Sequence, residues 1–295
     1  MYKRQLLQER VKHERLEREV EIAAEVQAQL FPREVPRLSA AAIVGECRAA
    51  RGVAGDYYDY VEIMPGLITL ALGDVAGKGI SAALVMSNLQ AALRAQTTIL
   101  AERIRIQTTA AATVVVSGGG SGSQSIEMPC GVTDVDTNCA VERIAASINE
   151  QLCRSTDANR FATLFLALYD DESRELRYTN AGHNAPLLVR ADGSIEQLTI
   201  GGTVVGAFDW ARYTEARTTL AAGDLLLIYS DGISEAQNPG GEEYGEERLA
   251  RLVLTNRDKS ADELRHLIFM EVDNWTGGEE RGDDQTVVIL KSSDR

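Results

Sequence analysis

Residues 67–84 read Leu-Ile-Thr-Leu-Ala-Leu-Gly-Asp-Val-Ala-Gly-Lys-Gly-Ile-Ser-Ala-Ala-Leu, and their character changes at one carboxylate. The part from Leu67 to Gly73 is apolar and typical of a strand that follows a turn. From Ile80 to Arg105 the apolar residues recur at helical spacing, which predicts a long helix packed after the strand. Asp74 therefore stands where a predicted strand ends, a place that holds a side chain at a sheet edge.

The rest of the chain alternates blocks of β-like segments with helical ones. The predicted strands are Ala42–Ala49, Tyr57–Ile63, Phe161–Tyr169, Glu175–Thr179, Pro186–Arg190, Thr214–Leu220, Asp224–Ser230 and Gln285–Leu290. The further predicted helices are Val141–Arg154, Glu246–Leu254 and Ala261–Thr276. Strands in blocks, with helices grouped between them, predict a layered α+β fold built on antiparallel sheets.

The N-terminal segment is typical of a coiled-coil helix. From Gln5 to Leu30 there is no Gly or Pro, and charged residues dominate. Phe31-Pro32 ends the helix because proline cannot continue the backbone ladder. We expect residues 1–34 to pair with a second copy of the chain, or to fold back, ahead of a globular domain over residues 35–295. The seam steps by three and four residues through Leu6, Glu9, His13, Leu16, Val20, Ala23, Gln27 and Leu30.

Residues 108–137 have an unusual composition for the interior of a domain. An Ala-Thr-Val run leads into Ser-Gly-Gly-Gly-Ser-Gly-Ser at residues 117–123 and then into a polar stretch. Glycine-serine runs are flexible linkers. The segment is therefore predicted to be a flexible insertion between two helices.

The formal net charge of −14 limits the classes of partner. Such a surface repels nucleic acid and anionic lipid. No stretch approaches the roughly 18 consecutive apolar residues of a membrane-spanning helix, and the charged residues after Met1 do not resemble a secretion signal. We expect a cytoplasmic protein that binds neither nucleic acid nor membrane.

Four acidic positions share one local pattern, an Asp beside a Gly or a second Asp at a predicted strand end. A single Asp-Gly is more often a turn than a metal ligand. Four of them favour a hard oxygen site for Mg²⁺ or Mn²⁺, because clustered carboxylates repel one another without a cation. The spacing alone does not show that they meet in space. They are Gly55-Asp56, Gly73-Asp74, Ser230-Asp231-Gly232 and Gly282-Asp283-Asp284.

Six ordered blocks between about Val35 and the C-terminus carry a family resemblance. They are residues 53–59 (Val-Ala-Gly-Asp-Tyr-Tyr-Asp), 73–84 (Gly-Asp-Val-Ala-Gly-Lys-Gly-Ile-Ser-Ala-Ala-Leu), 161–165 (Phe-Ala-Thr-Leu-Phe), 180–186 (Asn-Ala-Gly-His-Asn-Ala-Pro), 230–236 (Ser-Asp-Gly-Ile-Ser-Glu-Ala) and 283–286 (Asp-Asp-Gln-Thr). Together they resemble the bacterial SpoIIE/RsbU-type serine/threonine phosphatases of the protein phosphatase 2C (PP2C, PPM) superfamily. Ala54 departs from that pattern, since the family usually has a second Gly there.

The resemblance implies a layered α-β-β-α sandwich of two antiparallel sheets that holds two Mn²⁺ or Mg²⁺ ions. Asp74 would bridge both ions, and the Val75 carbonyl would be a further ligand. Asp56 and Asp231 would complete the first site or its water shell.

The remaining acidic pair and the substrate also follow from the resemblance. Asp283 takes the place of the family's last metal Asp, and Asp284 fills the neighbouring slot as a further candidate ligand. The implied reaction is hydrolysis of phosphoserine or phosphothreonine by water that the two ions activate. The implied substrate is a phosphorylated anti-sigma-factor antagonist of the STAS type, and no residue identifies the upstream sensor or activator.

Two further residues invite roles in the chemistry. His183 has the residue type of a general acid, but its block is expected beside the sheet, which favours a structural hydrogen-bonding role. Lys78 lies between two glycines and could contact phosphate, although Gly77-Lys78-Gly79 lacks the spacing of a nucleotide-binding loop. Simple loop geometry explains Lys78 equally well.

Two alternative functions remain open at this stage. A catalytically idle, phosphatase-like binding module would normally lack a metal carboxylate, and all four positions are acidic here. A nucleotide cyclase is suggested by the likeness of residues 54–58 to a Gly-Gly-Asp-Glu-Phe signature. The acidic fourth residue of that signature is missing, and a cyclase fold would not explain the Asp231 and Asp283 blocks.

Overall fold

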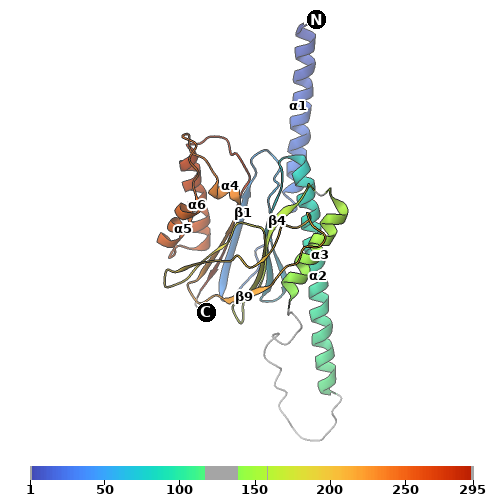
Figure 1. The fold of residues 1–295 in the computed structure, drawn as a ribbon, viewed down its shortest axis with the longest axis vertical. Coiled ribbons are helices and arrows are strands. Elements are labelled where there is room, and N and C mark those ends of the chain that lie inside the picture. Colours follow the sequence, from blue (N-terminus) through green and yellow to red (C-terminus); the bar gives the residue numbers. More distant parts are fainter. Residues whose placement is uncertain (1, 117–138, 158, 294–295) are drawn as a thin grey trace.

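The computed structural model describes residues 2–116, 139–157 and 159–293, and two facing β-sheets form its centre (Figure 1). The first sheet contains, in spatial order, β1 (Ala41–Arg48), β11 (Gln285–Ser292), β10 (Leu225–Tyr229), β6 (Leu187–Val189) and β7 (Ile195–Gln197). The second contains β2 (Tyr57–Met64), β3 (Leu67–Val75), β4 (Ala162–Asp170), β5 (Glu175–Ala181) and β8 (Gly201–Gly202), with β9 (Ala216–Thr219) beside β5. The pairs are antiparallel except for the short β5–β8 pair, which is parallel.

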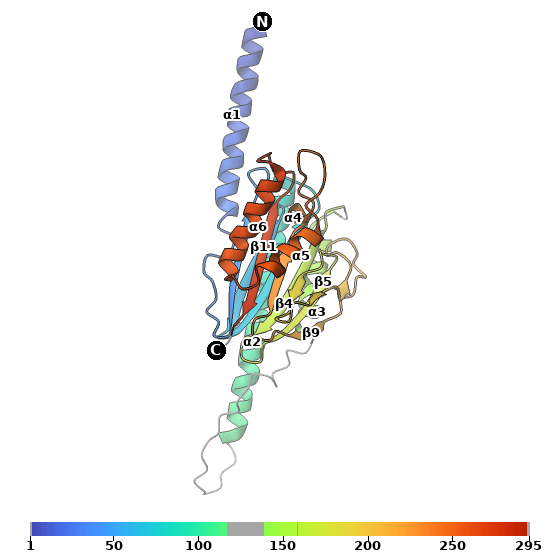
Figure 2. The same cartoon turned by 90° about the vertical axis from the view of Figure 1, so that its left-hand side faces the viewer.

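Helices cover the outer face of each sheet. Helices α2 (Ile80–Val116) and α3 (Ala140–Ser155) pack on the second sheet, and α5 (Glu246–Thr255) and α6 (Ala261–Thr276) pack on the first. Figures 1 and 2 show the two helical pairs on opposite sides of the sheets. The layered α-β-β-α fold expected from the sequence is therefore confirmed.

Strand β3 shows why this sequence forms a layered structure. Ile68, Leu70 and Leu72 face the core between the two sheets, whereas Ala71 and Val75 face the core beneath α2. A strand covered on both faces needs apolar residues at consecutive positions, which is the pattern of residues 67–72. The buried strand fixes the position of the carboxylate at its end.

Helix α2 is longer than the sequence predicts. It continues to Val116 instead of ending near Arg105, because residues 106–116 contain no Gly or Pro to stop it. Residues 108–116 of the predicted insertion at 108–137 therefore belong to α2, and the flexibility of the insertion stays a prediction. The glycine-serine run at 117–123 lies outside the described residues.

Helix α1 (Tyr2–Gln27) extends beyond the sandwich, as Figures 1 and 2 show. Its C-terminal end contacts the chain's own domain. A Cβ atom on Gly52 would lie 2.9 Å from Val20 Cγ1, and Leu30 packs against the core beneath α2. Ile22 and Val26 are more than half exposed. Among the described helices, none has the length and apolar content needed to cross a bilayer.

Candidate active site

Asp56 and Asp74 lie at the same edge of the second sheet. Asp56 immediately precedes β2, and Asp74 is the penultimate residue of β3. The two strands pair antiparallel, with Tyr57 opposite Gly73. The sequence placed Asp56 after a strand, and the structure corrects this. The two carboxylates still meet, because the start of one antiparallel strand shares an edge with the end of its neighbour.

Asp231, Asp283 and Asp284 lie at one edge of the first sheet. Asp231 opens the short helix α4 (Asp231–Ser234) after β10, and the pair Asp283-Asp284 precedes β11 rather than ending a strand. A Cβ atom on Gly232 would lie 2.0 Å from the Asp284 carbonyl oxygen. Only glycine permits this close backbone approach, which brings Asp231 beside the other two carboxylates.

Hydrogen bonds across the sandwich bring the two edges together. The Thr286 hydroxyl donates to Asp56 Oδ2 at 2.5 Å. Asp284 accepts from the Gly55 amide at 2.6 Å and from the Ala50 amide at 2.7 Å. Asp284 therefore positions the loop before Asp56. This role leaves further lone pairs on its oxygens, so the prediction that Asp284 is a metal ligand stays a prediction.

The carboxylates interact strongly with one another. Burial raises the pKa of Asp56 well above its usual value, and the neighbouring Asp74 carboxylate raises it further. Burial raises the pKa of Asp74 to about 7, together with the charges of Asp231, Asp283 and Asp284. Burial and Asp283 also raise the pKa of Asp231. Charges from both sheets therefore act on one region.

This donor set fits a hard divalent cation. Carboxylates that raise one another's pKa values carry an excess of negative charge that a cation would neutralise. The Lys78 ammonium, 2.6 Å from Asp283 Oδ2, already supplies part of that positive charge. Within the part of the chain that the structure describes, no three acidic, histidine or cysteine side chains are gathered as a ligand set. The carboxylates share an electrostatic site without converging on one point.

The Val75 carbonyl faces the loop that carries Asp56. A Cβ atom on Gly55 would lie 3.2 Å from Ala82 Cβ and 3.4 Å from the Val75 oxygen. Gly55 thus allows the loop to lie against both the end of β3 and the first turn of α2. The assignment of Val75 as a ligand stays a prediction.

His183 lies buried behind Thr163, which stands opposite Asp74 in the β3–β4 register. Its ring Nδ1 is 2.8 Å from the Thr163 hydroxyl, and its backbone amide donates to Asn180 Oδ1 at 2.7 Å. Burial lowers the pKa of His183 to about 4, and the Tyr229 carbonyl partly opposes this. A buried, neutral imidazole that contacts Thr163, on a backbone held by Asn180, supports the structural role.

We expect His183 to make stability depend on pH. The pKa of His183 is about 4 in the folded protein, against an ordinary value of 6.5 for the unfolded chain. The contribution of the neutral ring to stability is therefore complete above pH 6.5 and is lost as the pH falls toward 4. The free energy of unfolding should fall by up to about 1.4 kcal/mol per pH unit in this window. Urea titrations at several pH values should show that the free energy of unfolding of His183→Gln depends less on pH. This variant should keep most of its turnover. Inactivity of a folded variant would instead identify an acid catalyst.

Gln27 belongs to the surroundings of the site, although no sequence motif marked it. Its side chain accepts from the Ala54 amide at 2.8 Å and donates to the Ala54 carbonyl at 2.6 Å, two residues before Asp56. Gln27 is 7% exposed, which sets it apart from the exposed residues around it on α1. The available signal was a polar residue at a seam position, which a heptad pattern normally fills with an apolar side chain.

Comparison with known proteins identifies relatives of this chain. The family model described as stage II sporulation protein E (SpoIIE) matches residues 65–293. The phosphoserine phosphatase RsbU of Bacillus subtilis (strain 168) is 25% identical over 277 residues, which cover 92% of this chain and 70% of RsbU. The chain spans 41% and 36% of two other curated relatives, so it matches less than two thirds of their lengths.

Solved structures share the fold. The SiaA-PP2C domain of Pseudomonas aeruginosa has a TM-score of 0.71 at 16% identity, covering 95% of this chain and 98% of that domain. The catalytic domain of the serine/threonine phosphatase PstP, solved with two manganese ions, has a TM-score of 0.57 at 16% identity over 86% of this chain and 99% of that one. At these identities the likeness establishes the PP2C fold.

Proposed function

Because this chain belongs to the stage II sporulation protein E family, we propose that it is a metal-dependent serine/threonine protein phosphatase acting through two Mn²⁺ or Mg²⁺ ions. One observation carries the proposal. Asp56 and Asp74 from one sheet and Asp231 from the other lie in one electrostatic site that carries excess negative charge. A cyclase would not need Asp231, and an idle binding module would not need the whole set.

The residues that would hold the ions are those at the two sheet edges. Bound ions would supply an activated water and neutralise phosphate charge during in-line attack. Asp74 interacts electrostatically with Asp56 of its own sheet and with Asp231 of the other, which makes it the candidate for contact with both ions. The proposed ligands are Asp56, Asp74, Asp231, Asp283 and the Val75 carbonyl, with Asp284 as a further candidate.

Neighbouring residues keep this set in place. Thr286 donates to Asp56 and so favours its charged, metal-binding form. Asp284 fixes the loop that carries Asp56 through the Gly55 amide. Lys78, whose ammonium also donates to the Gly282 carbonyl at 2.7 Å, offers a cation to the phosphate of a substrate at the rim.

The proposed substrate is a phosphorylated anti-sigma-factor antagonist of the STAS type. The name of RsbU, a phosphoserine phosphatase, supports a phosphoserine substrate for its relative here. The test is phosphate release from such a phosphorylated antagonist with Mn²⁺ and with excess chelator. Release that requires the metal would support the proposal. Turnover of GTP with no release from the phosphoprotein would support a cyclase.

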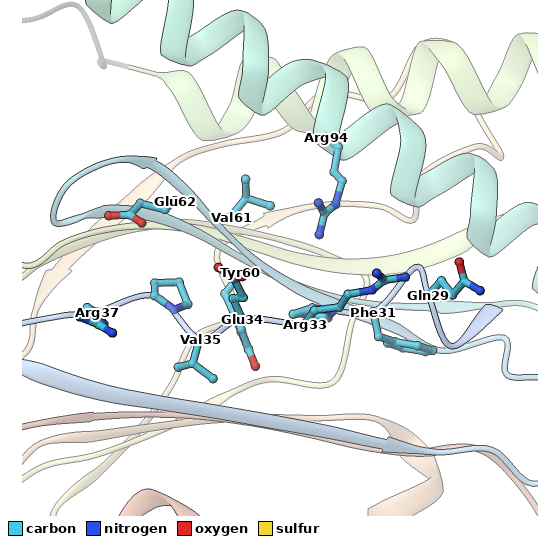
Figure 3. Close-up of a pocket in the computed structure, with 12 residues that line it drawn as sticks. Gln29, Phe31, Arg33, Glu34, Val35, Arg37, Tyr60, Val61, Glu62 and Arg94 are labelled. Atoms are coloured by element: carbon cyan, nitrogen blue, oxygen red, sulfur yellow. The ribbon is translucent and has the colours of Figure 1, made fainter. Parts of the chain in front are cut away.

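The N-terminal helix is proposed to be coupled to this site. Gln27, at the end of α1, holds the backbone of Ala54 in the loop that carries Asp56. A cavity of about 730 Å³ separates the linker after α1 from β2 (Figure 3). Arg94 reaches from α2 to line this cavity (Figure 3), and it pairs with the buried Asp59 at 2.9 Å. In the linker, Phe31 also packs its ring against Tyr57, with centroids 6.3 Å apart, so Gln27 and Phe31 both connect the helix to the residues around Asp56.

We also propose that α1 pairs with a second copy of the chain. Val20 and Leu30 face the chain's own domain, whereas Ile22 and Val26 are 56% and 59% exposed on another side of the helix. Most of the stability of a helix in a protein comes from packing of its apolar face, and the described part of this chain does not cover Ile22 and Val26. The exposed side therefore offers the apolar surface for pairing.

Substitution of Ile22 and Val26 by Asp should convert dimers to monomers and change turnover, because charges would occupy the apolar face of the pair. Light scattering measures the mass, and phosphate release measures the turnover. Val35→Asp, at a linker residue that is 53% exposed, is the matched control and should remain dimeric. A double variant that stays dimeric, or a monomer with unaltered kinetics, would contradict the coupling.

A further inference from the structure

A groove of about 440 Å³ lies between the N-terminal half of α2 and the segment that joins α3 to β4. None of the proposed metal ligands lines it. Its walls combine hydroxyl and amide groups with two arginines and an exposed leucine. The lining residues are Ser81, Leu84, Val85, Asn88, Arg154, Ser155, Thr156, Asp157 and Arg160.

The groove adjoins the carboxylate site. Val75, the residue after Asp74, pairs with Ala162 at the start of β4, and the Ala76 amide donates to the Phe161 carbonyl at 2.9 Å. Arg160 immediately precedes this connection. The first turn of α2 separates the groove from the Asp56 loop, so the distance across is about one helix diameter, roughly 10 Å.

The chemistry of the groove is unlike that of the chain as a whole. Within the described residues, the Arg160 guanidinium makes no ion pair or hydrogen bond, although the chain carries a net charge of −14. Leu84 is 67% exposed, and Ile80, one turn earlier, is 51% exposed. A free guanidinium beside exposed apolar side chains suits a ligand with an acidic and an apolar group.

The groove is also held in a fixed shape. Asn88 of α2 donates to the Ser155 hydroxyl at 2.5 Å and accepts from the Gln151 side chain at 3.1 Å. These bonds tie α2 to α3 along the floor of the groove. A surface that is already ordered loses little conformational entropy when a ligand binds.

We propose that this groove docks the phosphoprotein substrate, with Arg160 pairing with an acidic side chain and Leu84 contacting an apolar one. The inference rests on the proposed phosphatase function and adds a specificity determinant to it. An extended chain advances about 3.3–3.6 Å per residue. With the phosphoserine at the carboxylate site, a residue three or four positions away therefore reaches across the first turn of α2 into the groove.

Two labelled phosphoserine dodecapeptides test the proposal. Both have leucine four residues from the phosphoserine on each side, and they carry either Glu or Lys three residues away on each side. We expect kcat/KM to be about tenfold higher for the acidic peptide, which corresponds to roughly 1.4 kcal/mol. The negative net charge of the protein alone would favour the Lys peptide. A preference for the acidic peptide would therefore indicate binding in the groove.

Arg160→Glu should reverse the preference, and Leu84→Glu should lower kcat/KM for the acidic peptide about tenfold. Turnover of p-nitrophenyl phosphate, which is too small to reach the groove, should change less than twofold. Ile106→Glu is the matched control, because Ile106 is 63% exposed on the same helix, about 33 Å from Leu84 along the axis. It should behave as the unmodified protein in every assay.

Equal kcat/KM for the two peptides, or an unchanged preference in Arg160→Glu, would overturn the docking proposal. A protein that releases no phosphate from p-nitrophenyl phosphate would overturn the proposed function instead. Fluorescence anisotropy measures the affinity of the same peptides and tests docking whether or not the protein releases phosphate. Tighter binding of the acidic peptide that Arg160→Glu abolishes supports it, and equal binding refutes it.

Discussion

Asp74→Asn should abolish phosphate release and, in the metal-free protein, raise the melting temperature. The first effect follows from the proposed position of Asp74 between ligands of both sheets. Loss of the shared ligand should reduce kcat by on the order of a thousandfold, or about 4 kcal/mol. The second effect follows because the metal-free site holds several carboxylates that repel one another.

The sign of the stability effect follows from the pKa of Asp74. It is about 7 in the folded protein against a model value of 3.8, so at pH 7.5 without metal the ionised carboxylate destabilises the fold. Removing that charge should stabilise the metal-free protein by ~2–4 kcal/mol, which corresponds to roughly 5–15 °C for a domain of this size. Mn²⁺ should reverse the order by stabilising only the unmodified protein.

Differential scanning calorimetry at pH 7.5 measures the melting temperatures of the variant and the unmodified protein, first with chelator and then with Mn²⁺. Asp209→Asn is the control, because Asp209 is an exposed carboxylate in a loop outside the site. It should change neither the melting temperature nor the turnover. An Asp74→Asn variant that melts below the unmodified protein in chelator would show that repulsion among the carboxylates is not significant.

Gln27→Leu should weaken metal activation without unfolding the domain. Leucine fills a similar volume but leaves the buried Ala54 amide and carbonyl without their partners. Unsatisfied buried groups cost about 1–3 kcal/mol each, so the loop before Asp56 should leave its present position. We expect turnover at limiting Mn²⁺ to fall roughly tenfold to a hundredfold.

A metal titration separates this positioning role from general destabilisation. The Mn²⁺ concentration for half-maximal activity should rise in Gln27→Leu, and excess Mn²⁺ should restore most turnover. Gln29→Leu is the matched control, since Gln29 lines the cavity under the linker and does not bond Ala54. Equal metal requirements in the two variants would mean that Gln27 only anchors the helix.

Much of the fold could be predicted because periodicity reports burial. The consecutive apolar residues of β3 fit a strand that is buried on both faces, and the apolar side of α3 fits a helix packed on a sheet. The boundaries of both elements were therefore predicted to within about two residues. The two-residue strand β8 and the single turn α4 are too short to show a period. The length of α2 was underestimated because its last residues, rich in Thr and Val, have modest helix propensity.

The sequence marks the carboxylates of the site, but it does not show which distant segments hold them together. The Asp-Gly patterns mark each carboxylate locally, but the approach of the two sheet edges depends on hydrogen bonds such as Thr286 to Asp56, which join residues 230 positions apart. No local pattern encodes that distance. Gln27 was missed for the same reason, since its partner lies on a loop 27 residues further along the chain.

The central claim is that the carboxylates of the two sheet edges form one divalent-metal site that drives phosphate ester hydrolysis. The most direct measurement is p-nitrophenyl phosphate hydrolysis by the full chain, as Mn²⁺ is added back after excess chelator. The account predicts no turnover in chelator, recovery with Mn²⁺ in the unmodified protein and no recovery in Asp74→Asn. Full turnover in excess chelator, or recovery in Asp74→Asn, would contradict it.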